Sequence, residues 1–274
     1  MKNTILCATL LLVSLFATAQ NKQKWFNQTY GVAFSVAYDD AHSLVKYKGT
    51  GAQIGFGNES ETSKRILQVN NVFSFTPMSG QSKYAASTSA FDNRLAVTYL
   101  RKLPKFADKK VKISVGASNY VDFNLRLYKA AANNVVAWDA NVGLNVVGRA
   151  ERAFMFKNRS FVASYTLGLP LLAYNHRPNY LGFGPPAYIV EDKSENSKNG
   201  KSQGRVTTIN GHFLMLTQQI NLDKIFDNGN RIRLGYNWKY THNSFDEHLY
   251  QGITSGLSLS ILTNLSKQNT ANKG

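Results

Sequence analysis

Long rows of alternating apolar and polar residues constrain this chain more than any other feature. From Val111 to Leu127 nearly every odd position is apolar, and nearly every even position is polar or small. Similar rows run through Tyr30–Tyr38, Val136–Val146, Arg231–Tyr240 and Ile253–Ile261. Because successive side chains of a β-strand point to opposite faces, this period of two predicts strands with one apolar face.

The length and the polar faces of these rows favour a membrane barrel over a soluble sandwich. Several rows reach the roughly nine residues that a tilted strand needs to cross a membrane. Their polar faces carry Gly, Ser, Asn and Arg, which is typical of a wet or ion-paired interior. Aromatic residues suited to interfacial girdles recur near the row ends, at Trp25, Phe26, Tyr38, Tyr99, Tyr174 and Tyr240. We therefore predict an all-β fold, a closed antiparallel up-and-down transmembrane β-barrel.

Ten segments fit the pattern, and eight or twelve strands are compatible with it. An even number is expected of a single-chain bacterial barrel. The segments are Phe26–Tyr38, Thr50–Asn58, Arg65–Thr76, Phe91–Arg101, Lys110–Arg126, Val135–Val147, Ser160–Ala173, Arg205–Gln219, Arg231–Thr241 and Ile253–Leu265. Pro170 lies inside the seventh segment and removes a ladder hydrogen bond, so we expect a bulge or bend there.

The connections predict which end of the barrel faces the outside. Leu103–Lys109, Gly148–Asn158 and Asn221–Asn230 are short to middling, and the last contains the turn sequence Asp-Asn-Gly-Asn. Tyr174–Gly204 is much longer. Because outer-membrane barrels have short periplasmic turns and longer extracellular loops, we place Tyr174–Gly204 outside the cell.

The N-terminus predicts export. Lys2 precedes a mostly apolar run from Ile5 to Phe16, and Ala17-Thr18-Ala19 supplies the small residues that a signal peptidase reads. The run is shorter than the roughly 20 apolar residues of a membrane-spanning helix. We therefore assign residues 1–19 to a cleaved signal peptide and residues 20–274 to one barrel domain in the outer membrane.

Charge and cysteine content narrow the chemistry. The formal net charge is +16, and removal of Lys2 with the signal lowers it to +15. Such a surplus favours anionic partners, which after export are lipopolysaccharide phosphates and not nucleic acid. The single cysteine, Cys7, lies in the signal. The mature chain therefore has no thiol for a disulfide, a metal site or a nucleophile, and we expect no cofactor.

The signal, the ten alternating segments and the rhythm of short turns and long loops resemble Gram-negative outer-membrane β-barrel proteins. The resemblance covers nearly the whole mature chain and points to no subfamily. It implies contact with outer-membrane lipid, lipopolysaccharide and the barrel assembly machinery. One feature departs from the family, whose barrels often end on an aromatic residue: here a polar tail runs from Ser266 to Gly274.

Histidines and acids gather between the last two segments. The histidines are His242 and His248 and the acids are Asp246 and Glu247, and Ser244 lies among them. In a closed barrel the last strand pairs with the first, so this connection can approach Asp39, Asp40 and His42. His242 can then activate Ser244 as a nucleophile if an acid orients it. Alternatively, a divalent metal can bind Asp39, His42, His242 and His248. We favour a third interpretation, in which all of them are solvated loop residues.

The His-x-Ser pattern resembles the catalytic pair of outer-membrane lipid A deacylases. That resemblance implies catalytic roles for His242 and Ser244. The family's glutamate would fall near Gly256, where no acid occurs, so Asp246 and Glu247 are the nearest candidates. Asp39, Asp40 and His42 are loosely similar to the acid and histidine pairs of outer-membrane aspartyl proteases.

The polar faces of the predicted strands collect charge in the lumen. The residues are Asp92, Arg94, Lys112, Asp122, Arg126, Asp139, Arg231, Arg233 and Lys239. His212 falls on the lumen face as well. An open lumen would form a narrow, anion-preferring, porin-like channel. Ten strands lie near the size at which side chains fill a barrel, so we favour a lumen closed by ion pairs.

These observations predict a non-enzymatic outer-membrane β-barrel whose exposed loops interact with envelope components or extracellular ligands. A lipid A deacylase-like esterase and a narrow anion-preferring channel are the alternatives.

Overall fold

A computed structural model of the chain describes residues 23–39, 43–81, 87–104, 110–128, 136–177, 203–208, 213–245 and 248–266. They form the strands β1 (Gln23–Asp39), β2 (Ser43–Glu61), β3 (Arg65–Gly80), β4 (Ser87–Lys102), β5 (Lys112–Tyr128), β6 (Val136–Phe156), β7 (Arg159–Arg177), β8 (Gln203–Thr208), β9 (Phe213–Ile225), β10 (Arg231–Phe245) and β11 (His248–Asn264). Among the described residues, no helix is long and apolar enough to cross a membrane.

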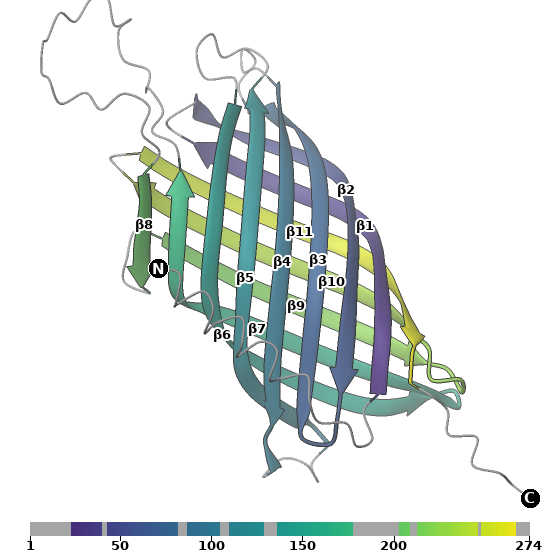
Figure 1. Cartoon of the computed structure of the whole chain (residues 1–274). Helices are drawn as coiled ribbons and strands as arrows, with labels where there is room; N and C mark the ends of the chain where they lie inside the picture. Colours follow the sequence, from purple (N-terminus) through teal and green to yellow (C-terminus); the bar gives the residue numbers. More distant parts are fainter. Residues whose placement is uncertain are drawn as a thin grey trace, which may run out of the picture.

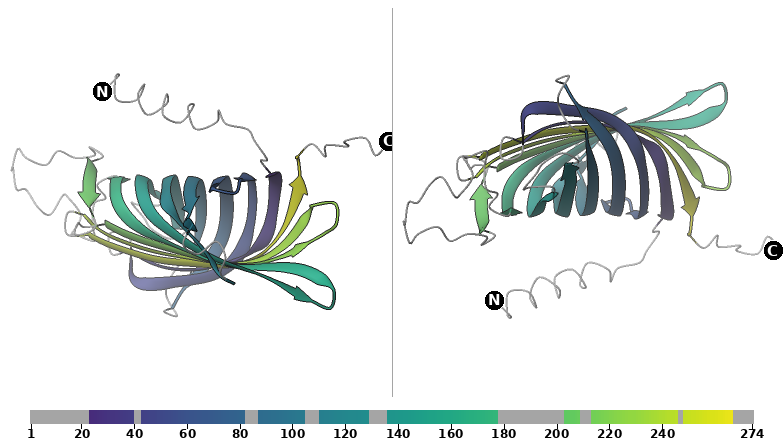
Figure 2. Two further views of the ribbon diagram at one scale, coloured as in Figure 1. Left: turned by 90° about the horizontal axis from the view of Figure 1, so that it is seen from below. Right: turned by 90° about the horizontal axis from the view of Figure 1, so that it is seen from above.

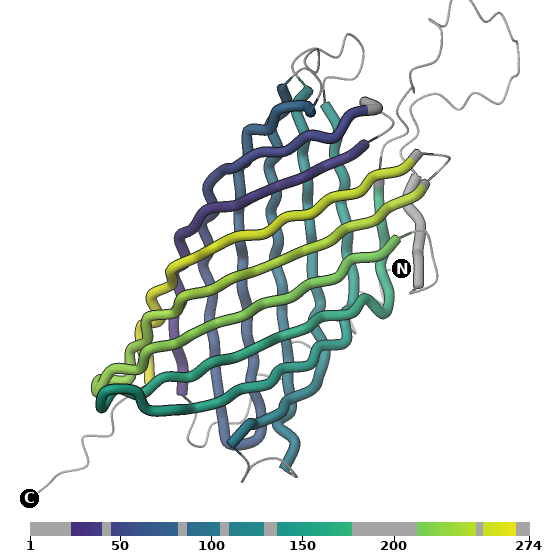
Figure 3. Tube along the Cα trace, turned by 180° about the vertical axis from the view of Figure 1, so that it is seen from behind, coloured from purple at the N-terminus to yellow at the C-terminus, as the bar shows by residue number. Residues whose placement is uncertain are grey.

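Ten of these strands close into one antiparallel barrel, as predicted. Strands β1 to β7 pair in sequence order, β9 to β11 continue the ring, and β11 returns to β1. Strand β7 pairs with both β6 and β9, which completes the circle. The strands are strongly inclined to one another across the barrel (Figures 1 and 3). We call the end with Gln23 and Asn264 the turn end, and the end with Asp39 and Tyr250 the loop end.

The predicted faces of the strands are confirmed. Leu234 and Leu257 point outward and are 56% and 52% exposed, whereas Arg233 and Asp122 point into the lumen and are 5% and 3% exposed. Lys112 shares the lumen face of Asp122 at the turn-end rim. The apolar rows therefore cover the outside of the barrel, and the polar rows fill it.

Pro170 lies at the predicted bulge. The β6–β7 register shifts there, because Leu144 pairs with Leu172 whereas Asn145 pairs with Pro170. Leu171 is the extra residue of β7. As a result, lumen-facing positions change from even numbers before the bulge to odd numbers after it, where Ala173 is buried.

Strand β6 runs much further than predicted. We expected a connection over Gly148–Asn158, but β6 continues to Phe156 and a tight turn leads into β7. Lys157 and Asn158 in that turn have φ angles of 48° and 58°, as in the two-residue turns that match the twist of hairpin strands. The β6–β7 hairpin extends to one side of the ring together with β9–β10 (Figure 2).

Two further expectations need correction. The segment predicted as one strand over Arg205–Gln219 contains two: β8 pairs only with the loop-end part of β7, and β9 pairs with the turn-end part.

Trp25 does not belong to an outward girdle. It is 2% exposed in the lumen, where its indole Nε1 donates to the Gly229 carbonyl oxygen at 2.9 Å and Arg231 lies over its ring.

Candidate functional site

A buried ion cluster near the loop end, the loop-end cluster, joins opposite walls of the barrel. Arg126 of β5 donates to Asp139 of β6 at 2.6 Å and to Asp39 of β1 at 3.1 Å. Its guanidinium also lies 4.2 Å from the ring centroid of Tyr250. Tyr47 of β2 is buried beside these residues. Charge and aromatic packing together fill this part of the lumen.

A second cluster, the middle cluster, spans the lumen closer to its centre. The Lys239 ammonium of β10 lies 2.5 Å from Asp92 of β4 and 3.0 Å from Asp122 of β5. Asn124 donates to the same Asp92 oxygen at 3.2 Å. One lysine therefore holds two carboxylates from the facing wall.

A third cluster, the turn-end cluster, is centred on Arg233. Its guanidinium lies 2.7 Å from Asp223 of the adjacent strand β9 and 3.2 Å from Glu59 of β2. Gln68 donates to the same Glu59 oxygen at 3.0 Å. Arg231 approaches Asp223 at 3.7 Å. Loss of one partner from any of the three clusters would leave a buried charge without compensation, which is costly.

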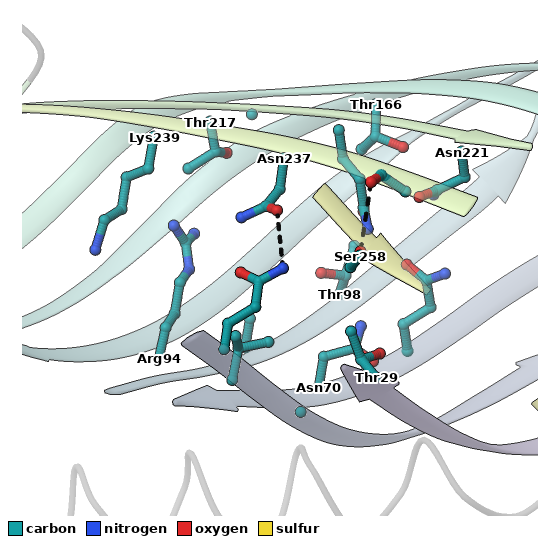
Figure 4. A pocket seen from close by; sticks show the side chains of 18 of the residues that line it. Thr29, Asn70, Arg94, Thr98, Thr166, Thr217, Asn221, Asn237, Lys239 and Ser258 are labelled. Atoms are coloured by element: carbon teal, nitrogen blue, oxygen red, sulfur yellow. Dashed lines mark hydrogen bonds between the residues drawn. The ribbon is translucent and has the colours of Figure 1, made fainter. Parts of the chain in front are cut away.

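A polar cavity of about 220 Å³ lies between the middle and turn-end clusters. Amide and hydroxyl side chains from most of the wall line it, and Arg94, Lys239, Asp92 and Arg233 contribute charge. Figure 4 shows Arg94 and Lys239 on one side and Asn221 and Thr166 on the other. Gln53 donates to Asn237 across the cavity at 3.5 Å. The interior is thus closed by charge at two levels and hollow between them.

All the acids of the described strands face the lumen and form ion pairs. They are Asp39, Glu59, Glu61, Asp92, Asp122, Asp139, Glu151 and Asp223. Outward-facing strand positions carry only bases among their charged residues, such as Lys46 and Lys48 near the loop end and Arg65 and Arg101 at the turn end. Sequence analysis did not place seven further charged residues in the lumen, because each lies beyond the end that it predicted for its strand. They are Asp39, Glu59, Glu61, Lys102, Arg149, Glu151 and Asp223.

The predicted catalytic residues His242 and Ser244 lie in β10, not in a loop. Two residues apart, they share the outward face of Trp238 and Tyr240. The His242 Nδ1 atom lies 3.4 Å from the Gln251 amide nitrogen. Asp246 and Glu247, the acids suggested for the pair, lie outside the described residues.

The structure separates two of the four predicted metal ligands. Asp39 faces the lumen and is ion-paired with Arg126, whereas His242 faces outward on the other side of the wall. His42, Asp40 and the side chain of His248 lie outside the described part, as does His212. Within the described part, no group of three or more His, Cys, Asp or Glu residues could hold a metal ion.

Comparisons with known proteins find similarity in structure but not in sequence. No protein-family model and no curated protein sequence matches the chain. The outer membrane protease OmpT from Escherichia coli is similar with a TM-score of 0.55 at 6% identity, over 88% of this chain and 96% of that chain. The translocator domain of the autotransporter NalP from Neisseria meningitidis matches with a TM-score of 0.36 at 10% identity, over 94% and 95%.

The chain therefore has the fold of a Gram-negative outer-membrane β-barrel protein, as its sequence predicted. At such low identity the likeness concerns the fold alone, because one fold can host many unrelated functions.

Proposed function

We propose that this protein is a non-enzymatic outer-membrane barrel with a closed lumen. It acts at its loop end, where exposed segments bind envelope components, above all the phosphates of lipopolysaccharide. The sorting of charge carries this proposal: the acids of the described strands point inward into ion pairs, and the charged side chains of the outward face are basic.

The ion-paired charges that face the lumen argue against a pore. An ion crossing the lumen would have to pass Arg126, Lys239 and Arg233, each of which bridges carboxylates from more than one strand. Opening such a path separates buried pairs and leaves their partners without compensation, which costs several kcal/mol per pair. The lumen is better suited to bracing the wall than to conducting.

The basic residues on the outward face support an anionic partner. Lys46 and Lys48 are exposed on the outward face of β2 near the loop end, on either side of the buried Tyr47. They continue the apolar row of Ile54 and Phe56. With the loop end outside the cell, we expect both ammonium groups to lie at the depth of the lipid phosphates, which they can bind as point charges.

The experiment compares the wild type with Lys46→Gln/Lys48→Gln and with the matched turn-end variant Arg65→Gln/Arg101→Gln. We expect the first double variant to retain less lipopolysaccharide on purification and reconstitution, and the second to retain as much as the wild type. In planar bilayers all three proteins should fail to conduct. Equal retention in all three would refute the lipopolysaccharide site, and steady anion-preferring conductance would favour the channel instead.

One observation favours a second function, that of a lipid-modifying esterase. His242 and Ser244 face outward near the loop end, on the side that acyl chains of the outer leaflet would contact. We expect no lipid A or phospholipid hydrolysis by the refolded protein, because the described residues supply His242 with an amide neighbour and no orienting carboxylate. Turnover that disappears in a folded Ser244→Ala variant would establish the enzyme.

A further inference from the structure

We propose that the exposed tip of the β6–β7 hairpin binds an extended, acidic segment of a periplasmic protein, which adds to the barrel wall as a further strand. The hairpin tip comprises residues 152–162, where β6 turns into β7. It lies at the turn end of the barrel, which faces the periplasm when the loop end is outside the cell. The proposal is therefore independent of the lipopolysaccharide site.

The hairpin tip has a free edge on its β6 side. Strand β5 pairs with β6 only as far as Lys112 and Glu151, whereas β7 pairs with β6 up to Phe156 and Arg159. Within the part of the chain that the structure describes, residues 152–156 therefore pair with β7 alone. Figure 2 shows this hairpin projecting beyond the ring. An unpaired strand edge is a template on which another chain can pair.

Two residues of β6 direct their backbone groups to the free edge. Phe156 and Arg159 flank the two-residue turn, and in such hairpins the flanking residues bond each other through both backbone groups. Because this pattern alternates along a strand, the N–H and C=O groups of Ala153 and Met155 point away from β7. Neither position carries the charge or the proline that commonly protects a strand edge. A further strand can therefore form a ladder there.

Both faces of the hairpin tip are exposed. Met155 is 72% exposed, although it continues the lumen-face row of Val147, which is 4% exposed within the ring. On the outward face Phe156 is 59% exposed. These two exposed fractions are the highest among the large apolar side chains of the described residues. Lipid covers only the outward face of a barrel, so it does not account for the exposure of Met155.

The charge of the hairpin tip selects an acidic partner. The tip contains Arg152, Lys157 and Arg159 and no Asp or Glu. Arg152 ends the outward apolar row of β6, which covers residues 136–150, so the tip extends past the apolar belt of the wall. The Lys157 ammonium lies 5.6 Å from the ring centroid of Phe156 on the same face. A neighbouring strand with carboxylates on this face would meet three cations.

A second copy of this chain fits the edge less well than an acidic strand. Two hairpin tips paired edge to edge would bring their bases together, and like charges on neighbouring strands are destabilising. An acidic strand can complement both faces of the tip, with carboxylates beside Arg152 and Arg159 and with apolar side chains over Met155. Because side chains of a strand alternate between faces, such a segment has acidic and apolar residues in turn.

The test uses a synthetic peptide of alternating glutamate and valine as the probe, and a peptide of alternating lysine and valine as its control. Each protein is refolded into lipid nanodiscs, and peptide binding is measured by fluorescence anisotropy. Met155→Pro removes an N–H from the free edge, where proline is tolerated, and Met155→Thr is its matched control because it keeps that N–H. Arg152→Gln/Arg159→Gln removes charge from the tip, and Arg65→Gln/Arg101→Gln removes the same charge elsewhere at the turn end.

We expect the glutamate peptide to bind the wild type and to slow hydrogen exchange at the Ala153 and Met155 amides, which should exchange rapidly without it. Met155→Pro and Arg152→Gln/Arg159→Gln should each weaken binding about tenfold, since the loss of one hydrogen bond corresponds to about that factor. The two matched variants should bind the peptide as the wild type does.

Slow exchange at these two amides in the protein alone would overturn the proposal, because lipid or another part of the chain would then cover the edge. Failure of the glutamate peptide to bind would overturn it too. So would equal binding by Met155→Pro and Met155→Thr, or equal binding of the two peptides, because an added strand needs the edge N–H and the bases need carboxylates. None of these results bears on the lipopolysaccharide comparison, which measures the loop end.

Discussion

The lumen face and the outward face of the barrel wall are built from alternate residues of the same strands, yet they obey opposite rules. On β10, Arg231, Arg233 and Lys239 face inward and form ion pairs across the lumen. Leu234 and Tyr236 of the same strand are 56% and 39% exposed on the outside. In a soluble protein this distribution would be inverted. Charge therefore braces this fold from within, while its apolar residues require a lipid environment outside.

The largest effect is expected from a change that exchanges the two faces. Deletion of Ser118 from β5 should turn Asp122 and Arg126 toward the membrane, because a slip of one residue moves every following side chain to the other face. We expect no folded barrel, measured as loss of heat-modifiable migration in gels. Deletion of Leu171, the extra residue of the β7 bulge, is the matched control. It leaves the paired residues Pro170 and Leu172 on their present faces and should give a folded barrel.

The next largest effect concerns the loop-end cluster. Arg126→Met should lower the free energy of unfolding by about 3–5 kcal/mol, because it leaves Asp39 and Asp139 buried without their cation. Reversible urea unfolding in lipid vesicles measures the change. Adding Asp39→Asn and Asp139→Asn should restore part of the loss. If the single variant were as stable as the wild type, the cluster would not brace the lumen.

A charge placed on the outward face should cost somewhat less. Leu234→Arg should destabilise the barrel by about 2–4 kcal/mol if Leu234 lies near the bilayer midplane. The same unfolding measurement applies, and Leu234→Ala separates loss of apolar contact from the cost of the charge. Equal stability of Leu234→Arg and Leu234→Ala would show that this position does not face lipid.

The smallest effect is expected at a lumen position beside the cavity. Asn237→Ser removes a long hydrogen bond from Gln53, at 3.5 Å, and enlarges a space that is already polar. We expect a change below about 1 kcal/mol, since a typical hydrogen bond contributes about that much. If Asn237→Ser lowered the free energy of unfolding as much as Leu234→Arg, the cavity wall would contribute as much to stability as the ion clusters on either side of it.

Much of this architecture follows from the sequence by itself. The alternation of residues such as Ile113 with Ser114, or Leu234 with Arg233, determines which side chains face out, because strand geometry has a period of two regardless of context. The ten strands of the barrel follow from the same pattern. The bulge at Pro170 follows from proline itself, because it lacks the backbone N–H that the ladder needs. Local periodicity is enough wherever the question concerns one strand and its two faces.

Only the tertiary structure decided which lumen residues meet. Arg126 and Asp39 are 87 positions apart, and Arg233 and Glu59 are 174 apart. Their contacts depend on closure of the ring and on the stagger between strands, which no single row encodes. The same stagger leaves the cavity between two ion clusters.

Asp39 and His242 lie on opposite sides of the wall, although their strands are close neighbours in the ring. Asp39 pairs with Tyr250, and Tyr250 pairs with Asn243, so these three share the lumen face. His242 is one position from Asn243 and points outward, because successive side chains of a strand alternate.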